Sequence, residues 1–187
     1  MELVEFGCIK RVTLPADWTA DPELNTSLMT MRSYHPRAQD DVEITFFRKL
    51  PGLRAEEIEK FRRFLDLPMH KIAEGSSELV ELTPVLGNAG NNQWSNRNRG
   101  AAGPNFRFTS GETIFIKDRL VLQVKGSFID PATKKALNEY CGLFFDSGAD
   151  KNTIEEAYLQ VPSRYGYFQF ERYLKVFMDA VFSIQWV

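Results

Sequence analysis

Between Trp94 and Arg99 the sequence gathers side chains of the types that bind a partner: Trp94, Asn96, Arg97, Asn98 and Arg99. The indole of Trp94 offers a large flat surface, and Trp and Arg are enriched at binding hot spots. Asparagine amides both donate and accept hydrogen bonds, which suits adaptable contacts. The pattern predicts a site for another protein at these residues.

These residues belong to a polar segment, residues 87–105, that has no hydrophobic pattern. A connection of this length inside a domain is usually functional or disordered, and we expect a long loop. Two alternatives to protein binding remain open. The loop is a tolerated insertion whose Trp94 packs back on the body, or it binds a nucleic acid or nucleotide through Trp94, Arg97 and Arg99. The net charge of −2 argues against nucleic acid, whose binders usually carry a strongly basic surface.

A second set of reactive types is His35, followed by Asp40 and Asp41 in the stretch HPRAQDD. A carboxylate beside a histidine could tune it as a general base, so an unrecognised enzyme is a further alternative. The simpler interpretation is a loop histidine beside surface acids. The usual nucleotide-binding, hydrolase and metalloprotease motifs are absent. We therefore expect no enzyme.

No metal and no cofactor are expected, because the chain has two histidines and lacks any Cys-x-x-Cys pair. The cysteines, Cys8 and Cys141, lie far apart in apolar runs and are predicted to be buried free thiols. The N-terminus does not resemble a signal peptide, and no apolar run is long enough to cross a membrane. These features predict a cytoplasmic protein in a reducing compartment.

The elements that must position these residues are those of a single α+β domain over residues 1–187, because 187 residues suffice for one core. We expect an antiparallel sheet of about six to eight strands with helices packed on it. The predicted strands lie at residues 3–13, 27–34, 42–50, 106–109, 113–117, 119–129 and 136–145, the last being the final major strand. Turns are predicted at Ser110-Gly111 and at Lys117-Asp118.

Three helices are predicted from apolar spacing or capping. Residues 54–67 place Ile58, Phe61 and Leu65 on one face, and a Thr153…Glu156 capping box predicts a short helix there. The closing segment carries a nearly ideal helical stripe formed by Phe170, Leu174, Phe177, Val181 and Ile184. Just before it, the stretch RYGYFQFERY interleaves aromatic and basic residues. Core packing with a partly exposed Tyr edge is expected there, with base stacking as the alternative.

Three segments together resemble the PsbP-like fold family: VTLPADW, FFRKLPGLRAEEIEKF and, after the stretch FIKDRLVLQVKGSF, the closing FERYLKVFMDAVFSIQW. This family includes an extrinsic photosystem II subunit, a Ran-binding nuclear import factor and many bacterial proteins. The resemblance implies an α/β/α sandwich and a protein that works by binding, as the bacterial chaperones of type VI secretion effectors do. It transfers no site residue, because the family has no fixed catalytic motif.

The sequence therefore predicts a non-catalytic cytoplasmic protein that binds another protein. An adaptor, a secretion-associated chaperone and a toxin-neutralising immunity-type protein all fit this description. The candidate partner-binding residues are Trp94, Asn96, Arg97, Asn98 and Arg99.

Overall fold

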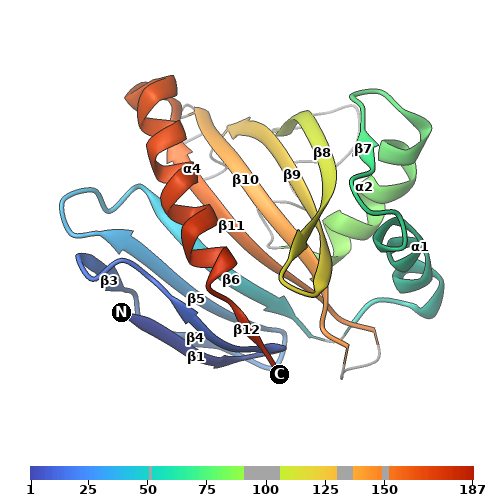
Figure 1. Ribbon diagram of the computed structural model, residues 1–187, viewed down its shortest axis with the longest axis horizontal. Coiled ribbons are helices and arrows are strands. Elements are labelled where there is room, and N and C mark those ends of the chain that lie inside the picture. Colours follow the sequence, from blue (N-terminus) through green and yellow to red (C-terminus); the bar gives the residue numbers. More distant parts are fainter. Residues whose placement is uncertain (51, 91–105, 130–136, 149–151) are drawn as a thin grey trace.

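A computed structural model of the protein describes residues 1–50, 52–90, 106–129, 137–148 and 152–187 (Figure 1). Its largest feature is a nine-stranded antiparallel sheet. The strands are β3 (Trp18–Ala20), β4 (Leu24–Asn25), β5 (Met29–Pro36), β6 (Glu43–Lys49), β7 (Lys71–Ile72), β8 (Phe106–Ile116), β9 (Arg119–Ile129), β10 (Leu137–Asp146) and β11 (Ile154–Pro162). They lie in the order β3-β5-β6-β11-β10-β9-β8-β7, and β4 pairs with β5. The predicted antiparallel α+β class is confirmed.

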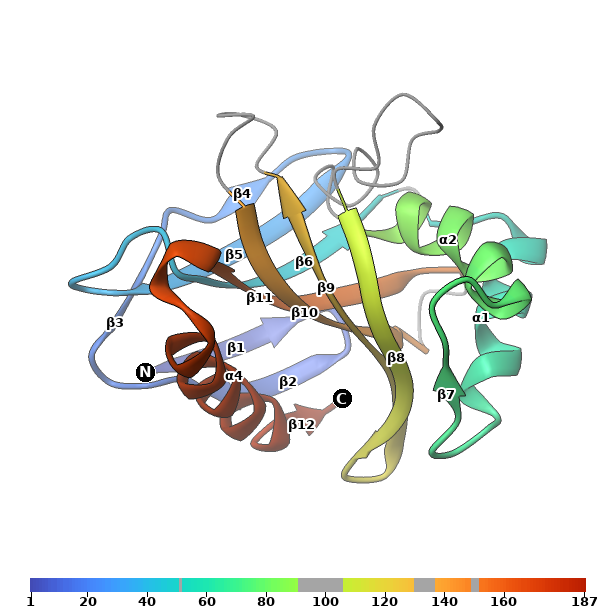
Figure 2. The same cartoon turned by 90° about the horizontal axis from the view of Figure 1, so that it is seen from above.

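Helices cover both faces of this sheet (Figures 1 and 2). One face carries α4 (Tyr167–Phe182), preceded by the 3-10 turn η1 (Ser163–Tyr165). A small sheet shares that face and consists of β1 (Glu2–Phe6), β2 (Ile9–Thr13) and β12 (Gln185–Trp186). The other face carries α1 (Ala55–Leu65) and α2 (Ser77–Ala89). Two separate hydrophobic cores result, one on each side of the sheet.

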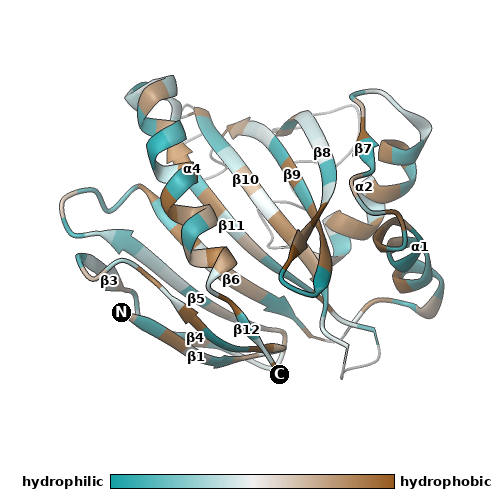
Figure 3. Ribbon diagram, viewed as in Figure 1, coloured by the Kyte–Doolittle hydropathy of each residue, from teal (hydrophilic) through white to brown (hydrophobic). Residues whose placement is uncertain are grey.

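The stripe predicted for the closing helix packs α4 onto the sheet. Leu174, Phe177, Val181 and Ile184 are buried in the core on that side, and Phe170 packs against it partly buried. Figure 3 shows hydrophobic and hydrophilic residues following one another along α4, as expected for a helix with one face on a sheet. The predicted helix at residues 54–67 is also found, as α1.

The short helix predicted from Thr153 and Glu156 is wrong, because this segment forms β11, a central strand between β6 and β10. Pairing on both edges supplies every backbone hydrogen bond that a strand needs, so the tertiary context overrides a local capping signal. The expectation that residues 136–145 form the final major strand fails for the same reason. Along β11, Glu155 and Glu156 are both buried and point to opposite faces of the sheet.

Two predicted strand boundaries also differ. The strands predicted at 106–109 and 113–117 form one strand, β8, which ends at Ile116 and in which the register shifts between Phe108 and Ser110. A bulge therefore takes the place of the predicted Ser110-Gly111 turn. Conversely, the single strand predicted at residues 3–13 is a hairpin of β1 and β2, which turns at Gly7 with φ +54°.

The polar segment predicted to be a loop over residues 87–105 begins later than expected. Gly87 to Ala89 form the last turn of α2. The side chains of Leu86 and Ala89 are buried. The helix continues here because Leu82, Val85, Leu86 and Ala89 recur at helical spacing and pack in the core. Residues 91–105 lie outside the described part of the chain.

Candidate functional site

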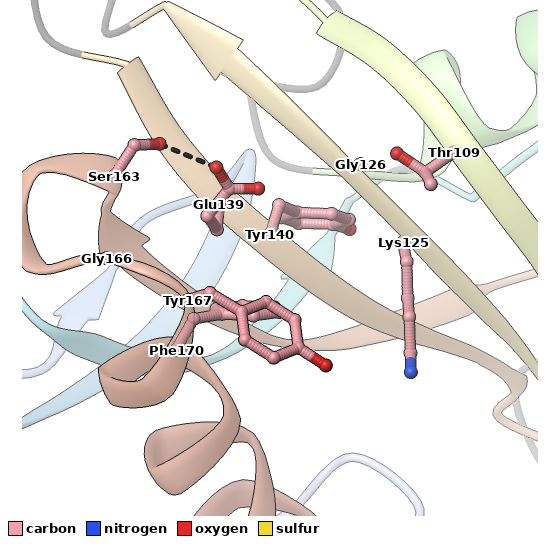
Figure 4. Close-up of a pocket in the computed structure, with 9 residues that line it drawn as sticks. All are labelled: Thr109, Lys125, Gly126, Glu139, Tyr140, Ser163, Gly166, Tyr167 and Phe170. Atoms are coloured by element: carbon pink, nitrogen blue, oxygen red, sulfur yellow. Dashed lines mark hydrogen bonds between the residues drawn. The ribbon is translucent and has the colours of Figure 1, made fainter.

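A cavity of about 260 Å³ lies between the start of α4 and the sheet (Figure 4). We call it the helix–sheet cavity. Its sheet side is formed by Thr109, Lys125, Gly126, Glu139 and Tyr140, on β8, β9 and β10. Its helix side is formed by Ser163, Gly166, Tyr167 and Phe170. Apolar surface predominates in the lining, so the cavity suits an apolar group.

The chain bends into this position through Gly166, which precedes α4 with φ +79°. This backbone conformation favours glycine, and it lets α4 start directly after η1 and turn back over the sheet. In Figure 1, α4 passes in front of β11 and beside β10, whereas no described element stands in front of β8 and β9. The cavity therefore lies where the covered part of this sheet face meets its open part.

Exposed apolar side chains lie on the elements that form the cavity. Tyr167 is 70% exposed and Phe168 is 88% exposed, although both are large aromatic residues. Their rings meet edge to face, with centroids 5.9 Å apart. At the same end of the sheet, Ile129 and Leu137 face each other across β9 and β10, and both are exposed. Clustered exposed apolar side chains beside a pocket are typical of a binding surface.

One basic and one acidic side chain, Lys125 and Glu139, also line the cavity. Ser163 Oγ donates a hydrogen bond of 2.7 Å to Glu139 Oε1, which fixes the carboxylate near the start of α4. Lys125 extends from β9 on the opposite side of the cavity, as Figure 4 shows. A ligand in this cavity therefore meets aromatic walls and two charges of opposite sign.

The five residues predicted to bind a partner, Trp94, Asn96, Arg97, Asn98 and Arg99, lie outside the described residues. Their role remains a prediction. The described chain resumes at Phe106, whose ring is buried against Tyr140 with centroids 5.5 Å apart.

The structure gives His35 a different partner from the predicted ones. His35 Nε2 lies 3.3 Å from Asp21 Oδ1, an ion pair when the ring is protonated. Asp41 instead accepts hydrogen bonds from Arg164 and from Tyr165 Oη, in η1. The enzyme hypothesis thus gains no support from a pairing of His35 with Asp40 or Asp41.

Both cysteines are buried and free, as predicted. Burial raises the pKa of the Cys141 thiol to about 12, and the same cause, with the nearby Glu155 charge, raises the pKa of Cys8 to about 12. Since the thiolate is the reactive form, both thiols are inert near neutral pH.

A fully buried carboxylate, Glu155 on β11, joins the large sheet to the small one. Its oxygens accept hydrogen bonds from Cys8 N at 3.1 and 3.2 Å, and Arg48 Nε lies 3.9 Å away. Burial raises the pKa of Glu155 to about 7, against the lowering effect of the Cys8 N–H and of Arg48. Because Glu155 is 0% exposed, its contacts make it part of the structure and not a surface that a partner reaches.

Sequence reasoning placed Tyr167 and Phe168 in an aromatic stretch but expected mainly core packing there. The buried and the exposed aromatic residues of this stretch can be told apart by their position relative to the helical stripe. Phe170, Leu174 and Phe177 follow the stripe, whereas Phe168 lies outside it. An aromatic residue outside the buried stripe of an amphipathic helix must face solvent or a partner. Lys125 and Glu139 carry no such signal, since each is one charged residue in a strand.

In the described part of the chain, no three His, Cys, Asp or Glu residues are placed to share a metal ion. None of its helices combines the length and the apolar character that crossing a membrane requires. A comparison of the chain with models of known families, with curated proteins and with solved structures finds no match. The resemblance to the PsbP-like family therefore stays a prediction.

Proposed function

We propose that this protein is a non-catalytic binding protein of the cytoplasm that holds a segment of a partner polypeptide in the helix–sheet cavity. Such an activity suits an adaptor, a secretion-associated chaperone or a toxin-neutralising protein. The observation that carries the proposal is the pair Tyr167 and Phe168 at the start of α4, which are 70% and 88% exposed; Tyr167 lines the cavity, and the Phe168 ring contacts the Tyr167 ring. Transfer of two adjacent aromatic rings from water into an interface has a large favourable free energy, which these rings gain only when a partner covers them.

The size and lining of the cavity favour a polypeptide over a small cofactor. Its volume of about 260 Å³ is below the roughly 300–1,000 Å³ typical of small-molecule sites, and it suits one or two side chains. Hot spots in protein interfaces are aromatic anchors beside small desolvated pockets, with a polar rim. Tyr167, Phe168 and the cavity lined by Phe170 have this arrangement.

Nucleic-acid or nucleotide binding remains a second proposal for Trp94, Arg97 and Arg99. Within the described residues, the aromatic pair at Tyr167 has both Lys125 and Glu139 beside it in the cavity lining. A carboxylate at this position repels phosphate, which favours a polypeptide at the helix–sheet cavity.

The test is site-specific photo-crosslinking in the cells that produce the protein. A photoreactive amino acid replaces Phe168 in one variant and Val80 in a control. Val80 is also well exposed, at 68%, but lies on α2 on the opposite face of the sheet. We expect a discrete adduct only from position 168, and we expect protease but not nuclease to degrade the partner in that adduct.

Phe170→Ala in the position-168 variant should reduce the adduct, because Phe170 lines the cavity that anchors the partner. Equal adducts from positions 168 and 80, or none from position 168, contradict the proposal. An adduct whose partner is degraded by nuclease supports the nucleic-acid alternative instead.

A further inference from the structure

Within the described residues, the two charges that line the helix–sheet cavity have no ion-pair partner. Neither Lys125 nor Glu139 takes part in any ion pair among residues 1–50, 52–90, 106–129, 137–148 and 152–187. In the described part of the chain, the side chain of Glu139 has a hydrogen bond from the neutral hydroxyl of Ser163 and from no charged group. Both side chains are half-buried, so each charge has lost part of its hydration without gaining an opposite charge.

Strand register sets the spacing of these charges. Lys125 pairs with Cys141, and Glu139 pairs with Ser127, so Lys125 and Glu139 are diagonal neighbours on adjacent strands. Diagonal neighbours on one face of a sheet lie about 7–8 Å apart. Both point to the α4 side, because their strand neighbours Val124 and Tyr140 are buried in the core on the other side.

Figure 4 shows how the cavity separates the two charges. Glu139 lies at the Ser163 end, and Lys125 lies at the other end. Tyr167 and Phe170 project from α4 beside the space between them. A bound segment therefore passes a negative end, an apolar middle and a positive end.

We propose that the partner segment carries an apolar anchor residue flanked by two charged residues of opposite sign, a base that meets Glu139 and an acid that meets Lys125. This inference rests on the proposed function and names the chemistry of its partner. In an extended segment, side chains two positions before and two positions after the anchor are on the same side as the anchor and about 13–14 Å apart. The two strand positions are about 7–8 Å apart, and long charged side chains on the segment and on Lys125 bridge the difference. Opposite charges at the rim set specificity, while the anchor supplies most of the affinity.

Five labelled peptides test the inference by NMR titration of the full chain. Each peptide has one central Leu in a Gly/Ser background, with one test residue two positions before the Leu and another two positions after it. In this order the pairs are Glu and Lys, Lys and Glu, Glu and Glu, Lys and Lys, and Gln and Gln. For the wild-type protein we expect both mixed-charge peptides to bind about fivefold more tightly than either same-charge peptide, because an exposed ion pair contributes up to roughly this factor. Raising the salt concentration should reduce the difference.

Charge variants of the protein give the decisive comparison. Lys125→Glu should change the preference to the Lys and Lys peptide. In the Glu139→Gln variant, a base in the peptide should no longer increase the affinity, whereas an acid should still increase it. The glutamine side chain can still form the hydrogen bond with Ser163. Circular dichroism verifies that each variant is folded.

The outcomes separate this inference from the proposed function. If peptides bind at Tyr167 and Phe168 with the same affinity whatever their charges, or if the preference does not follow the variants, the charge pattern is wrong and the binding surface stands. If no peptide shifts the resonances of these residues, both proposals are overturned.

Discussion

Both carboxylate oxygens of Glu155 accept the backbone N–H of Cys8, at 3.1 and 3.2 Å, and so tie the β1–β2 turn to the centre of the large sheet. Desolvation makes this arrangement costly for the ionised form, and it raises the pKa of Glu155 from 4.5 to about 7. The native state therefore binds a proton more tightly than the unfolded chain does. Below pH 4.5 both states are protonated and the charge costs nothing, whereas the cost is complete above pH 7.

The first prediction concerns this pH window. Between pH 5 and 8 the free energy of unfolding should fall by up to about 3 kcal/mol through Glu155 alone, at 1.36 kcal/mol per pKa unit. Urea unfolding at several pH values measures it. Glu155→Gln should remove this part of the pH dependence, while Glu5→Gln, an exposed control, should keep it. Parallel pH profiles for wild type and Glu155→Gln would show that the carboxylate does not titrate in this range.

The second prediction is that Gly7→Ala destabilises the protein strongly. A Cβ at Gly7 would clash with the carboxyl group of Glu155, and the φ of +54° at Gly7 already disfavours alanine. We expect a loss of about 3 kcal/mol from backbone strain and overpacking together. Gly75→Ala is the matched control, because Gly75 has φ +74° but nothing within 4 Å of its Cβ. Its loss should be about 1 kcal/mol, and equal losses for the two variants would refute the close approach.

The third prediction separates core from surface within α4. Phe177 is fully buried and Phe168 is 88% exposed, although both are phenylalanines of one helix. Phe177→Ala should lower the free energy of unfolding by about 3–5 kcal/mol, and Phe168→Ala should change it by less than about 0.5 kcal/mol. Thermal and urea unfolding measure both. A large loss from Phe168→Ala would mean that this ring packs in the fold.

The spacing of apolar residues predicted much of the fold. The stripe from Phe170 to Ile184 identified α4, because a helix on a sheet buries one face at a fixed period. The same local reasoning failed at Thr153, since nothing within residues 153–161 shows that β6 and β10 lie on either side of them. A central strand is stabilised by strands that are distant in sequence, whereas a capping-box pattern depends only on residues that are close in sequence.

The candidate site was less accessible to sequence reasoning than the fold. Lys125 and Glu139 come from different strands, and their diagonal relation depends on a register that no local pattern encodes. Phe168 could have been singled out, because it breaks the apolar period of α4. The composition of residues 87–105 predicts a binding loop, and because residues 91–105 lie outside the described chain, this role stays a prediction.

The fourth prediction concerns Ser163, which positions Glu139 through a 2.7 Å hydrogen bond. Ser163→Ala should cost about 1 kcal/mol of stability or less, because a neutral hydrogen bond at a half-buried site contributes little. It should weaken binding of peptides that carry a base, and leave unchanged the binding of the Gln and Gln peptide. Titrations of both peptides measure this. Equal weakening for the two peptides would indicate a general distortion of the cavity.

Binding of a polypeptide at the start of α4 can be measured by calorimetric titration of the captured partner. The wild-type protein is compared with Tyr167→Ala/Phe168→Ala and with Leu28→Ala/Val80→Ala, whose residues are also exposed but lie elsewhere. Loss of an aromatic hot spot costs at least about 2 kcal/mol, so the first variant should bind roughly 30-fold or more weakly, and the control should bind like wild type. Unchanged affinity in the Tyr167→Ala/Phe168→Ala variant would contradict the account.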